Sequence, residues 1–366
     1  MAKELDSSQI FQSIANHYSE PISFTRVGNG YHADGFIGTS PNGQIFARQM
    51  NSLGFGHDLP SDRLKSMLES RESLPHGLKT HAVLLFGSDG TVTEVPPFSE
   101  VVTIADVLPS DAYHLGTILR TPAQTPVEVD DIVEKAQSIA SVMTDVMADI
   151  HATKFEGDNL HATSLYRRAT AAIIHDPELT AGVIDFADPP TPWMSHHEGV
   201  LLVADMEKAR RAYGVHPERV SQIHGDFWTN NAYQRTDGTL YITDPRLTWG
   251  EPAIDAGWVI GEFLMQDIVR SGSFNRDFTQ TIQRAMHAYV EKTGDTDIYA
   301  YMHLPYAFQT LAEAAFTPGI RDDQRRILFA TGVGALQDAQ SHIPFSFENL
   351  QSYTKKGQTR LSALAI

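Results

Sequence analysis

His224-Gly225-Asp226-Phe227-Trp228-Thr229-Asn230-Asn231, followed thirteen residues later by Asp244, is the stretch of this chain that most strongly constrains its fold. It has the pattern H-x-D-x-x-x-x-N and then a second acid. Thr236-Asp237-Gly238 is a turn signal between two short runs of strand-forming residues, which predicts a hairpin directly after the loop. We therefore expect Asn231 and Asp244 to lie at the same end of that hairpin.

These residue types and this spacing suit the transfer of a phosphoryl group. Such a reaction needs a carboxylate that accepts a hydroxyl proton, and it needs oxygen ligands that hold Mg²⁺ on a triphosphate. Asp226 is the candidate base, and Asn231 and Asp244 are the candidate metal ligands. The alternative is a structural aspartate in a turn and an asparagine cap. Several specified residues at fixed spacing favour the functional interpretation.

The composition is that of a soluble globular protein. The 366 residues are 42% hydrophobic and 20% charged, and this length can hold two lobes. No stretch approaches the roughly 18 apolar residues of a membrane span, and the first residues lack the apolar core of a secretory signal. A cytoplasmic location without membrane contact is therefore expected. The absence of cysteine excludes disulfides, thiolate zinc sites and cysteine nucleophiles.

The chain is strongly acidic, with a formal net charge of -17. This charge disfavours nonspecific binding of nucleic acid and favours the attraction of a cationic substrate. The alternative is that the charge serves only solubility. Acids of the C-terminal half are candidates for receiving ammonium groups, or else are solvated helix residues. They are Glu262, Asp267, Glu313, Asp322 and Asp323.

The N-terminal part is predicted to be a helix followed by an antiparallel sheet. Residues 6–18 have apolar side chains at helical spacing, and the chain then alternates and is punctuated by glycine. The predicted strands are 23–32, 35–38, 44–49, 80–86 and 91–94, with a second helix at 61–72. Pro96-Pro97 cannot donate successive ladder hydrogen bonds, which predicts an exit from the sheet into a hinge. The first domain is therefore expected to span residues 1–98.

The remainder, residues 99–366, is predicted to be mainly helical. Residues 130–154 carry a long apolar rhythm at helical spacing, and residues 158–215 are interpreted as an insertion with two or three further helices. The other predicted helices are 256–270, 278–293, 299–315 and 322–341.

A sheet lobe, a hinge, a helical lobe and the H-G-D-x-x-x-x-N loop together resemble the aminoglycoside phosphotransferase and choline kinase superfamily. The segments 223–231, 242–244 and 250–255 are similar to its catalytic loop, its metal-ligand strand and its G-D-P-x-x-D segment. Residues 148–152 are similar to its L-x-x-L-H signature. The resemblance covers nearly the whole chain and extends to fructosamine-kinase-like and methylthioribose-kinase-like relatives. It implies an α+β, bilobal protein-kinase-like fold, with a small antiparallel-sheet lobe before a larger helical lobe.

The resemblance also implies roles for individual residues. Asp226 takes the place of the catalytic base, and Asn231 and Asp244 take the places of the Mg²⁺ ligands. His224 and Asp255 support the loop, Asp255 as a buried anchor that accepts backbone hydrogen bonds; the competing interpretation makes His224 the base. The expected ATP contacts are Gly28, Gly30, Arg48, Glu94 and Phe98. Gly28 and Gly30 form only a G-x-G, which is also typical of an ordinary hairpin turn.

Arg48 departs from the family pattern, which has lysine at this strand position. Its fixed guanidinium can bind phosphate, yet loss of the lysine is also seen in inactive kinases. Either Glu69 or Glu72 of the predicted helix 61–72 is its candidate partner, with a solvated face as the alternative for both.

Gly225 and Trp228 narrow the substrate class. Gly225 stands where protein kinases have arginine, so a phosphorylated activation loop would find little to bind, and a small-molecule kinase is favoured. Trp228 matches the H-G-D-x-W variant of fructosamine-kinase-like members and is a candidate substrate contact through its ring. Core packing is the alternative for Trp228, and also for Trp249 and Trp258.

Three functions compete on these residues. The first is an ATP- and Mg²⁺-dependent O-phosphotransferase acting on a hydroxyl of an aminoglycoside, an amino sugar or another small alcohol, a cationic one included. The second is a nucleotide-binding pseudokinase scaffold without turnover, which Arg48 and the sparse G-x-G motivate. A metal-dependent phosphohydrolase built on His224, Asp226 and Asp244 is the third, and it needs more ligands than the local sequence supplies.

Overall fold

The structure is a computed structural model that describes residues 7–29, 33–50, 74–77, 80–86, 100–105, 107–120, 126–174, 195–243, 245, 249–317 and 319–362. The chain forms two compact units. One comprises Met1–Ala112 with Arg235–Arg246, and the other comprises Tyr113–Gln234 with Leu247–Ile366. The predicted fold class is confirmed, because an antiparallel sheet comes first and a mainly helical part follows it.

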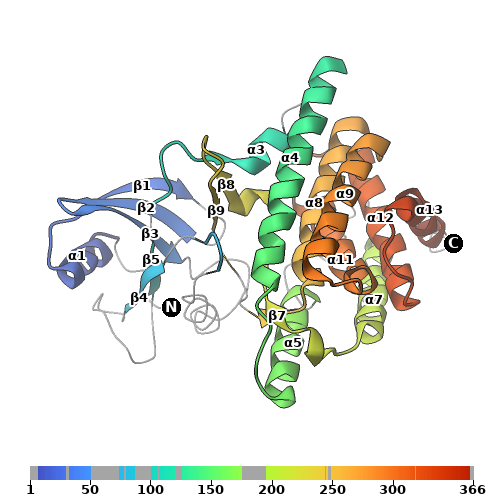
Figure 1. Ribbon diagram of the computed structural model, residues 1–366, viewed down its shortest axis with the longest axis horizontal. Coiled ribbons are helices and arrows are strands. Elements are labelled where there is room, and N and C mark those ends of the chain that lie inside the picture. The colour runs from blue at the N-terminus through green and yellow to red at the C-terminus, as the bar shows by residue number, and fades with distance from the viewer. Residues whose placement is uncertain are drawn as a thin grey trace. The chain divides into compact units, whose positions relative to one another are not determined.

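The first unit is built on a five-stranded sheet in the order β1-β2-β3-β5-β4, with antiparallel pairing throughout (Figure 1). Its elements are α1 (Ser7–Tyr18), β1 (Ser23–Asn29), β2 (Ala33–Ser40), β3 (Gly43–Met50), β4 (Thr80–Phe86), β5 (Glu100–Ala105) and β9 (Leu240–Ile242). The apolar face of α1 covers the sheet, because Ile10 and Ile14 are fully buried in one cluster with Phe36, Ala47 and Leu84.

Strand β5 corrects the sequence interpretation of the proline pair. The prolines were expected to end the sheet, but β5 lies beyond them and pairs with both β3 and β4. Residues 100–105 read EVVTIA, a short apolar run that periodicity alone does not distinguish from a linker next to a proline pair. The predicted strand 91–94 and helix 61–72 lie outside the described residues.

The second unit is mainly helical, and the 26-residue helix α4 runs along it beside α8 and α9 (Figure 1). Its longer helices are α4 (Pro126–His151), α5 (Asn159–Ile174), α7 (His196–Tyr213), α8 (Ala253–Ser271), α9 (Arg276–Thr293), α11 (His303–Phe316), α12 (Asp322–Gln340) and α13 (Leu350–Ser362). The short elements are β6 (Tyr113–His114), α3 (Leu115–Arg120), η1 (Pro217–Arg219), β7 (Ser221–Gln222), η2 (Thr229–Asn231), β8 (Ala232–Gln234), β10 (Trp249–Gly250), α10 (Ile298–Tyr301) and η3 (Phe347–Asn349).

The apolar residues predicted at helical spacing in α4 are buried in the core. Ile139, Met143, Met147 and Ile150 recur at helical spacing, and each is at most 4% exposed. Burial of such a stripe, more than helix propensity, holds a helix of this length in place. Among the helices that the structure describes, none is both long and apolar enough to cross a membrane.

Candidate functional site

The predicted base and one predicted metal ligand lie together after β7. Asp226 is partly exposed, and Asn231 at the end of η2 turns its amide toward it. The Asn231 Nδ2 group donates to the Asp226 backbone oxygen across 2.9 Å and to Asp226 Oδ2 across 3.1 Å. The loop therefore brings a carboxylate and a carboxamide, five residues apart, into direct contact.

This pair has the chemistry of a hard-cation site. The carboxamide has its two polar atoms on opposite sides, so the side of Asn231 that faces Asp226 is the nitrogen, and Oδ1 faces away. Amide and carboxylate oxygens are the ligands that Mg²⁺ prefers. Asn231 therefore fits a magnesium site through its Oδ1, with Asp226 beside it as the candidate base. Asp244, the other predicted ligand, lies outside the described residues.

Asp255 holds the first half of the loop. It lies in the first turn of α8 and is fully buried. Its two carboxylate oxygens accept hydrogen bonds from the backbone N–H groups of His224 and Gly225, each at 2.7 Å. Gly225 has a φ of 78°, a left-handed conformation that favours glycine. The left-handed bend at Gly225 and the hydrogen bonds to Asp255 thus fix the backbone conformation directly before Asp226.

A second buried histidine supports Asp255 from behind. His151 ends α4, in the segment that resembles the family signature, and its Nε2 lies 3.1 Å from Asp255 Oδ2. The other ring nitrogen, Nδ1, lies 2.8 Å from the hydroxyl of Tyr289 on α9. Because Asp255 accepts through this bond, a neutral His151 donates from Nε2, and its Nδ1 accepts a hydrogen bond from the Tyr289 hydroxyl. Three helices, α4, α8 and α9, are thereby connected to the loop.

His224 supports the loop from within the core. Its side chain is fully buried, and its Nδ1 accepts the backbone N–H of Asp226 across 3.2 Å. A ring nitrogen that accepts this bond carries no proton, and the ring packs against Phe227 with centroids 5.5 Å apart. The ring is therefore shielded from solvent, while the carboxylate of Asp226 is partly exposed.

The tryptophans near the loop differ in their surroundings. Trp228 is partly exposed, and its buried indole Nε1 has no hydrogen-bond partner among the described residues. The same is true of Trp258, which follows Asp255 by one turn of α8. Trp249 packs edge-on against Phe155 with ring centroids 5.5 Å apart. Trp228 is thus a partly exposed aromatic residue within the loop, which suits a ligand contact.

Of the predicted nucleotide contacts, Gly28 and Arg48 lie in the sheet of the first unit. Gly28 pairs with Gly35 across the β1–β2 ladder, next to a register shift. Arg48 is partly buried on β3 and pairs with Gly35 of β2 and Thr103 of β5. The remaining calls for the nucleotide site, Gly30, Glu69, Glu72, Glu94 and Phe98, lie outside the described residues.

Three of the acids proposed to be solvated or to receive ammonium groups are buried, so solvation is the wrong account of them. Glu313 accepts a hydrogen bond from Gln309 Nε2 across 2.8 Å. Asp267 is fully buried, and burial raises the pKa of Asp267 to about 6, against the opposing hydrogen bond from the Asn275 N–H. Glu262, also fully buried, contacts the catalytic loop itself.

The contact of Glu262 was not predicted. Both donors of Thr229, its N–H and its hydroxyl, bind the Glu262 carboxylate at 2.6 Å. His114 of β6 was also missed, and its Nε2 lies 2.8 Å from the backbone oxygen of Asn230. The only signal in the sequence was the spacing of Asp255 and Glu262, seven residues apart and hence on one face of α8.

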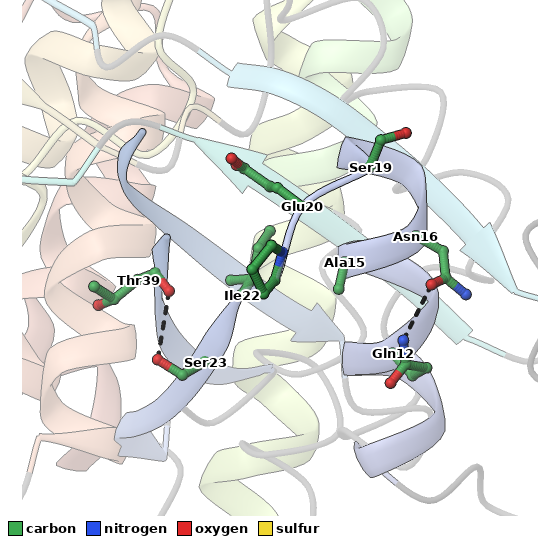
Figure 2. A pocket seen from close by; sticks show the side chains of 9 residues that line it. Gln12, Ala15, Asn16, Ser19, Glu20, Ile22, Ser23 and Thr39 are labelled. Atoms are coloured by element: carbon green, nitrogen blue, oxygen red, sulfur yellow. Dashed lines mark hydrogen bonds between the residues drawn. The ribbon is translucent and has the colours of Figure 1, made fainter. Parts of the chain in front are cut away.

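The first unit also carries a shallow depression of about 780 Å³ (Figure 2). It is lined mainly by polar side chains from the end of α1 and from β1 and β2, such as Asn16, Glu20 and Ser23. Its lining, as far as the structure describes it, includes none of the predicted site residues.

Comparison with known proteins supports the prediction of a small-molecule kinase fold. Residues 200–291, which include the catalytic loop, Asp244 and Asp255, match the fructosamine kinase family model. Ethanolamine kinase from Plasmodium vivax is similar in structure, with 10% identity, a TM-score of 0.50, and coverage of 94% of this chain and 82% of its own. A microcompartment-associated aminopropanol kinase has 12% identity, a TM-score of 0.52, and coverage of 96% and 99%. No curated protein matches this sequence significantly.

The chain therefore shares the fold of these small-molecule kinases, and its residues 200–291 match the fructosamine kinase family model. The resemblance seen in its motifs is thereby confirmed. The family match is to fructosamine kinase, and it covers the part of the chain that carries the loop.

Proposed function

We propose that this protein transfers the γ-phosphoryl group of ATP to a hydroxyl of a small polar molecule, with Asp226 as the catalytic base. The observation that carries the proposal is the contact of Asn231 Nδ2 with Asp226 Oδ2 at 3.1 Å, in a loop whose backbone is fixed by Asp255. A base held this firmly loses little freedom when the substrate arrives.

The reaction needs few chemical steps from the protein. The substrate hydroxyl oxygen forms a bond to the γ-phosphorus, the bond from that phosphorus to the bridging oxygen breaks, and ADP leaves. The hydroxyl proton passes to a carboxylate oxygen of Asp226. Asn231, with Asp244 as the further candidate, would hold Mg²⁺, which offsets the charge that develops on the phosphate oxygens.

The N-terminal residues have supporting roles in this proposal. Arg48 on β3 would bind the phosphates through its guanidinium, in place of the lysine typical of the family. Gly28 would allow a close approach of backbone to phosphate. Gly30, Glu94 and Phe98 remain candidates for contact with the nucleotide.

The substrate is proposed to be an amino alcohol, an amino sugar or a ketosamine. The family match to fructosamine kinase and the similarity to ethanolamine and aminopropanol kinases favour hydroxyl compounds that also carry an amine. The net charge of -17 would attract such a cation. Trp228 is the candidate contact, through its ring face.

The test is a panel of fructosamines, amino sugars, aminoglycosides and amino alcohols, incubated with labelled ATP and Mg²⁺. We expect label on at least one compound, and a loss of about 100-fold or more in rate for Asp226→Ala. The control is Thr359→Ala. Thr359 lies on the exposed face of α13, so this substitution should leave the rate unchanged.

A pseudokinase is the second candidate, and Arg48 is the feature that favours it. Thermal-shift titration separates the two, because a ligand that binds the folded state raises the melting temperature. ATP binding that is indifferent to Mg²⁺, with no labelled product and no effect of Asp226→Ala, would support the scaffold and overturn the kinase.

A further inference from the structure

We infer that Glu262 is a positioning residue that fixes η2 and so aims the carboxamide of Asn231 at the bound cation. The inference rests on the proposed function, since it assigns a task within that site. It concerns a fully buried side chain, so Glu262 acts through the loop and does not touch the substrate.

The contact itself is short and uses both oxygens. Thr229 is the first residue of η2 and is fully buried. Its N–H donates to Glu262 Oε2 and its hydroxyl donates to Glu262 Oε1, both across 2.6 Å. A carboxylate that accepts two hydrogen bonds from one residue fixes both the position and the orientation of that residue. Glu262 thus caps the start of η2 from a different element, 33 residues along the chain.

Helix α8 holds both halves of the loop on one face. Asp255 accepts the N–H groups of His224 and Gly225, and Glu262, two helical turns further on, accepts the N–H and the hydroxyl of Thr229. Asp226 lies between these two anchors. The distance between the anchors is set by the helix, which is stiff, so the loop ends cannot drift apart.

The opposite side of η2 is also fixed. His114 Nε2 lies 2.8 Å from the backbone oxygen of Asn230, and the same ring contacts Thr117 Oγ1 through Nδ1 at 3.1 Å. Gly116 packs closely against this turn, because a Cβ there would lie 2.3 Å from Asn230 Oδ1 and 3.1 Å from Thr229 Oγ1. The turn is therefore clamped between α8 and the start of α3.

The contacts of Glu262 and His114 with η2 fix the turn that carries Asn231, the candidate metal ligand. Asn231 follows Thr229 by two residues, its N–H donates to the Trp228 backbone oxygen at 3.0 Å, and its side chain binds Asp226. Groups that orient a ligand from behind typically change metal affinity 10- to 100-fold when they are altered. Loss of the Glu262 contact should therefore weaken the binding of the cation more than the binding of the nucleotide.

The test compares Glu262→Gln with Glu198→Gln. Glu198 makes a related contact in α7, because its Oε2 accepts the N–H of Ser195 at 2.8 Å and its hydroxyl at 3.0 Å, while its Oε1 binds Arg326 at 2.6 Å. The two variants thus make the same substitution at a carboxylate that binds both donors of a hydroxyl residue, and only Glu262 binds the loop; Glu198→Gln additionally loses the ion pair with Arg326. Thr229→Val removes one donor of the clamp, and Thr229→Ser retains both.

Two measurements are made on the full-length protein. Mn²⁺ binding in the presence of ATP is followed by the electron paramagnetic resonance signal of the free ion, and ATP binding without metal is measured by calorimetry. We expect Glu262→Gln and Thr229→Val to weaken Mn²⁺ binding about tenfold or more. Metal-free ATP binding should stay within about twofold, and Glu198→Gln and Thr229→Ser should resemble the wild type.

The outcomes are distinct. Unchanged Mn²⁺ binding in Glu262→Gln, or an equal loss in Glu198→Gln, overturns the positioning role. If Glu262→Gln does not fold, Thr229→Val decides by the same criteria. A wild type that binds Mn²⁺ and ATP but phosphorylates nothing in the panel overturns the proposed function, and leaves the assignment of Glu262 to the metal ligand to stand on the binding data.

Discussion

His151 lies 3.1 Å from Asp255, so the last residue of α4 and the first turn of α8 are joined by a buried hydrogen bond at the carboxylate that holds the loop 224–231. Both side chains are at most 1% exposed. Asp255 uses its remaining accepting capacity for two backbone N–H groups of that loop. The loop is therefore held by the packing of the helices, and its geometry depends on their stability.

We expect Asp255→Asn to destabilise the protein and to lower its activity. The asparagine would turn an NH₂ group toward donors at His224, Gly225 or His151, and it would remove the charge that strengthens these bonds. A buried donor left without an acceptor costs about 1–3 kcal/mol, and more where a charge is involved. Urea denaturation should show a loss of about 2–4 kcal/mol.

The matched control for this prediction is Asp226→Asn. It makes the same change in the same loop, but at a partly exposed carboxylate whose bond from Asn231 Nδ2 an asparagine oxygen can accept. Its stability should stay within about 0.5 kcal/mol of the wild type. Equal stability of the two variants would contradict the anchoring role of Asp255.

The buried ion pairs of Arg219 lead to a second prediction. Its guanidinium binds Glu251 at 2.7 Å and Asp295 at 2.9 Å, and lies 4.4 Å from the centroid of the Tyr301 ring. Glu251 is fully buried, so Arg219→Met would leave a desolvated carboxylate without its cation. We expect a loss of about 3–5 kcal/mol in urea denaturation.

Removal of both charges should cost less than removal of one. In the double variant Arg219→Met with Glu251→Gln, no unpaired carboxylate remains at the buried position, although Asp295 keeps its charge nearer the surface. The double variant should therefore be more stable than Arg219→Met alone, measured under the same conditions. A double variant that is less stable than the single one would show that the pair contributes mainly through packing.

The sequence was sufficient to predict those features that depend on local patterns. The apolar stripe of α4 and the H-x-D-x-x-x-x-N loop each lie within one continuous segment, so their periodicity and spacing can be recognised. Strand β5 was missed because a short apolar run next to two prolines has no distinctive period. Helix α13 was missed because its residues, LQSYTKKGQTRLS, are mostly polar and its Gly357 weakens a helical pattern.

The residues that hold the loop, Glu262 and His114, could not be predicted from the sequence for a different reason. Glu262 and His114 bind η2 from positions 33 and 116 residues away, and only the folded chain brings them there. From the sequence, Glu262 is one of several helical acids, and a solvated surface is the usual place for such residues. Its burial beside Thr229 follows from the packing of α8, which no local pattern specifies.

Gly357 provides a third prediction. The effect of Gly357→Ala on the free energy of unfolding should be opposite in sign to the effect expected from helix propensity. In an ordinary helix, glycine to alanine stabilises by up to about 1 kcal/mol. In α13, however, a Cβ at Gly357 would lie 1.7 Å from the backbone oxygen of Ala330, and one at Gly334 of α12 would lie 1.9 Å from that of Tyr353. The two helices cross through these glycines, and backbone cannot give way as a flexible side chain can.

We therefore expect Gly357→Ala to lower the free energy of unfolding by about 1–3 kcal/mol, the range for overpacking. Thr359→Ala tests helix propensity on the exposed face of the same helix and should change stability by less than about 0.5 kcal/mol. Thermal or urea denaturation measures both variants. A stabilising effect of Gly357→Ala would mean that α12 and α13 are further apart than the structure has them.

The pH dependence of stability should include a contribution from His303. This residue is 1% exposed, and its Nε2 lies 2.8 Å from the hydroxyl of Tyr353. Burial lowers the pKa of His303 to about 4, with Asp338 opposing and Lys356 adding to the shift. The folded protein therefore keeps the ring neutral in a range where the unfolded chain, with a histidine pKa of about 6.5, binds a proton.

The sign follows from proton linkage. Below about pH 6.5 the unfolded state binds more protons than the folded state at this residue, so stability is lost as the pH falls toward about 4. Between about pH 7 and about pH 4.5 this amounts to about 2 kcal/mol. His303→Gln cannot titrate and can still bond to Tyr353, so its stability should fall by about 2 kcal/mol less than that of the wild type over the same interval. Other groups contribute equally to both proteins, so the difference between their urea denaturation curves isolates His303. Parallel pH profiles would contradict a neutral, buried His303, and they would point to a ring that is already protonated in the folded protein.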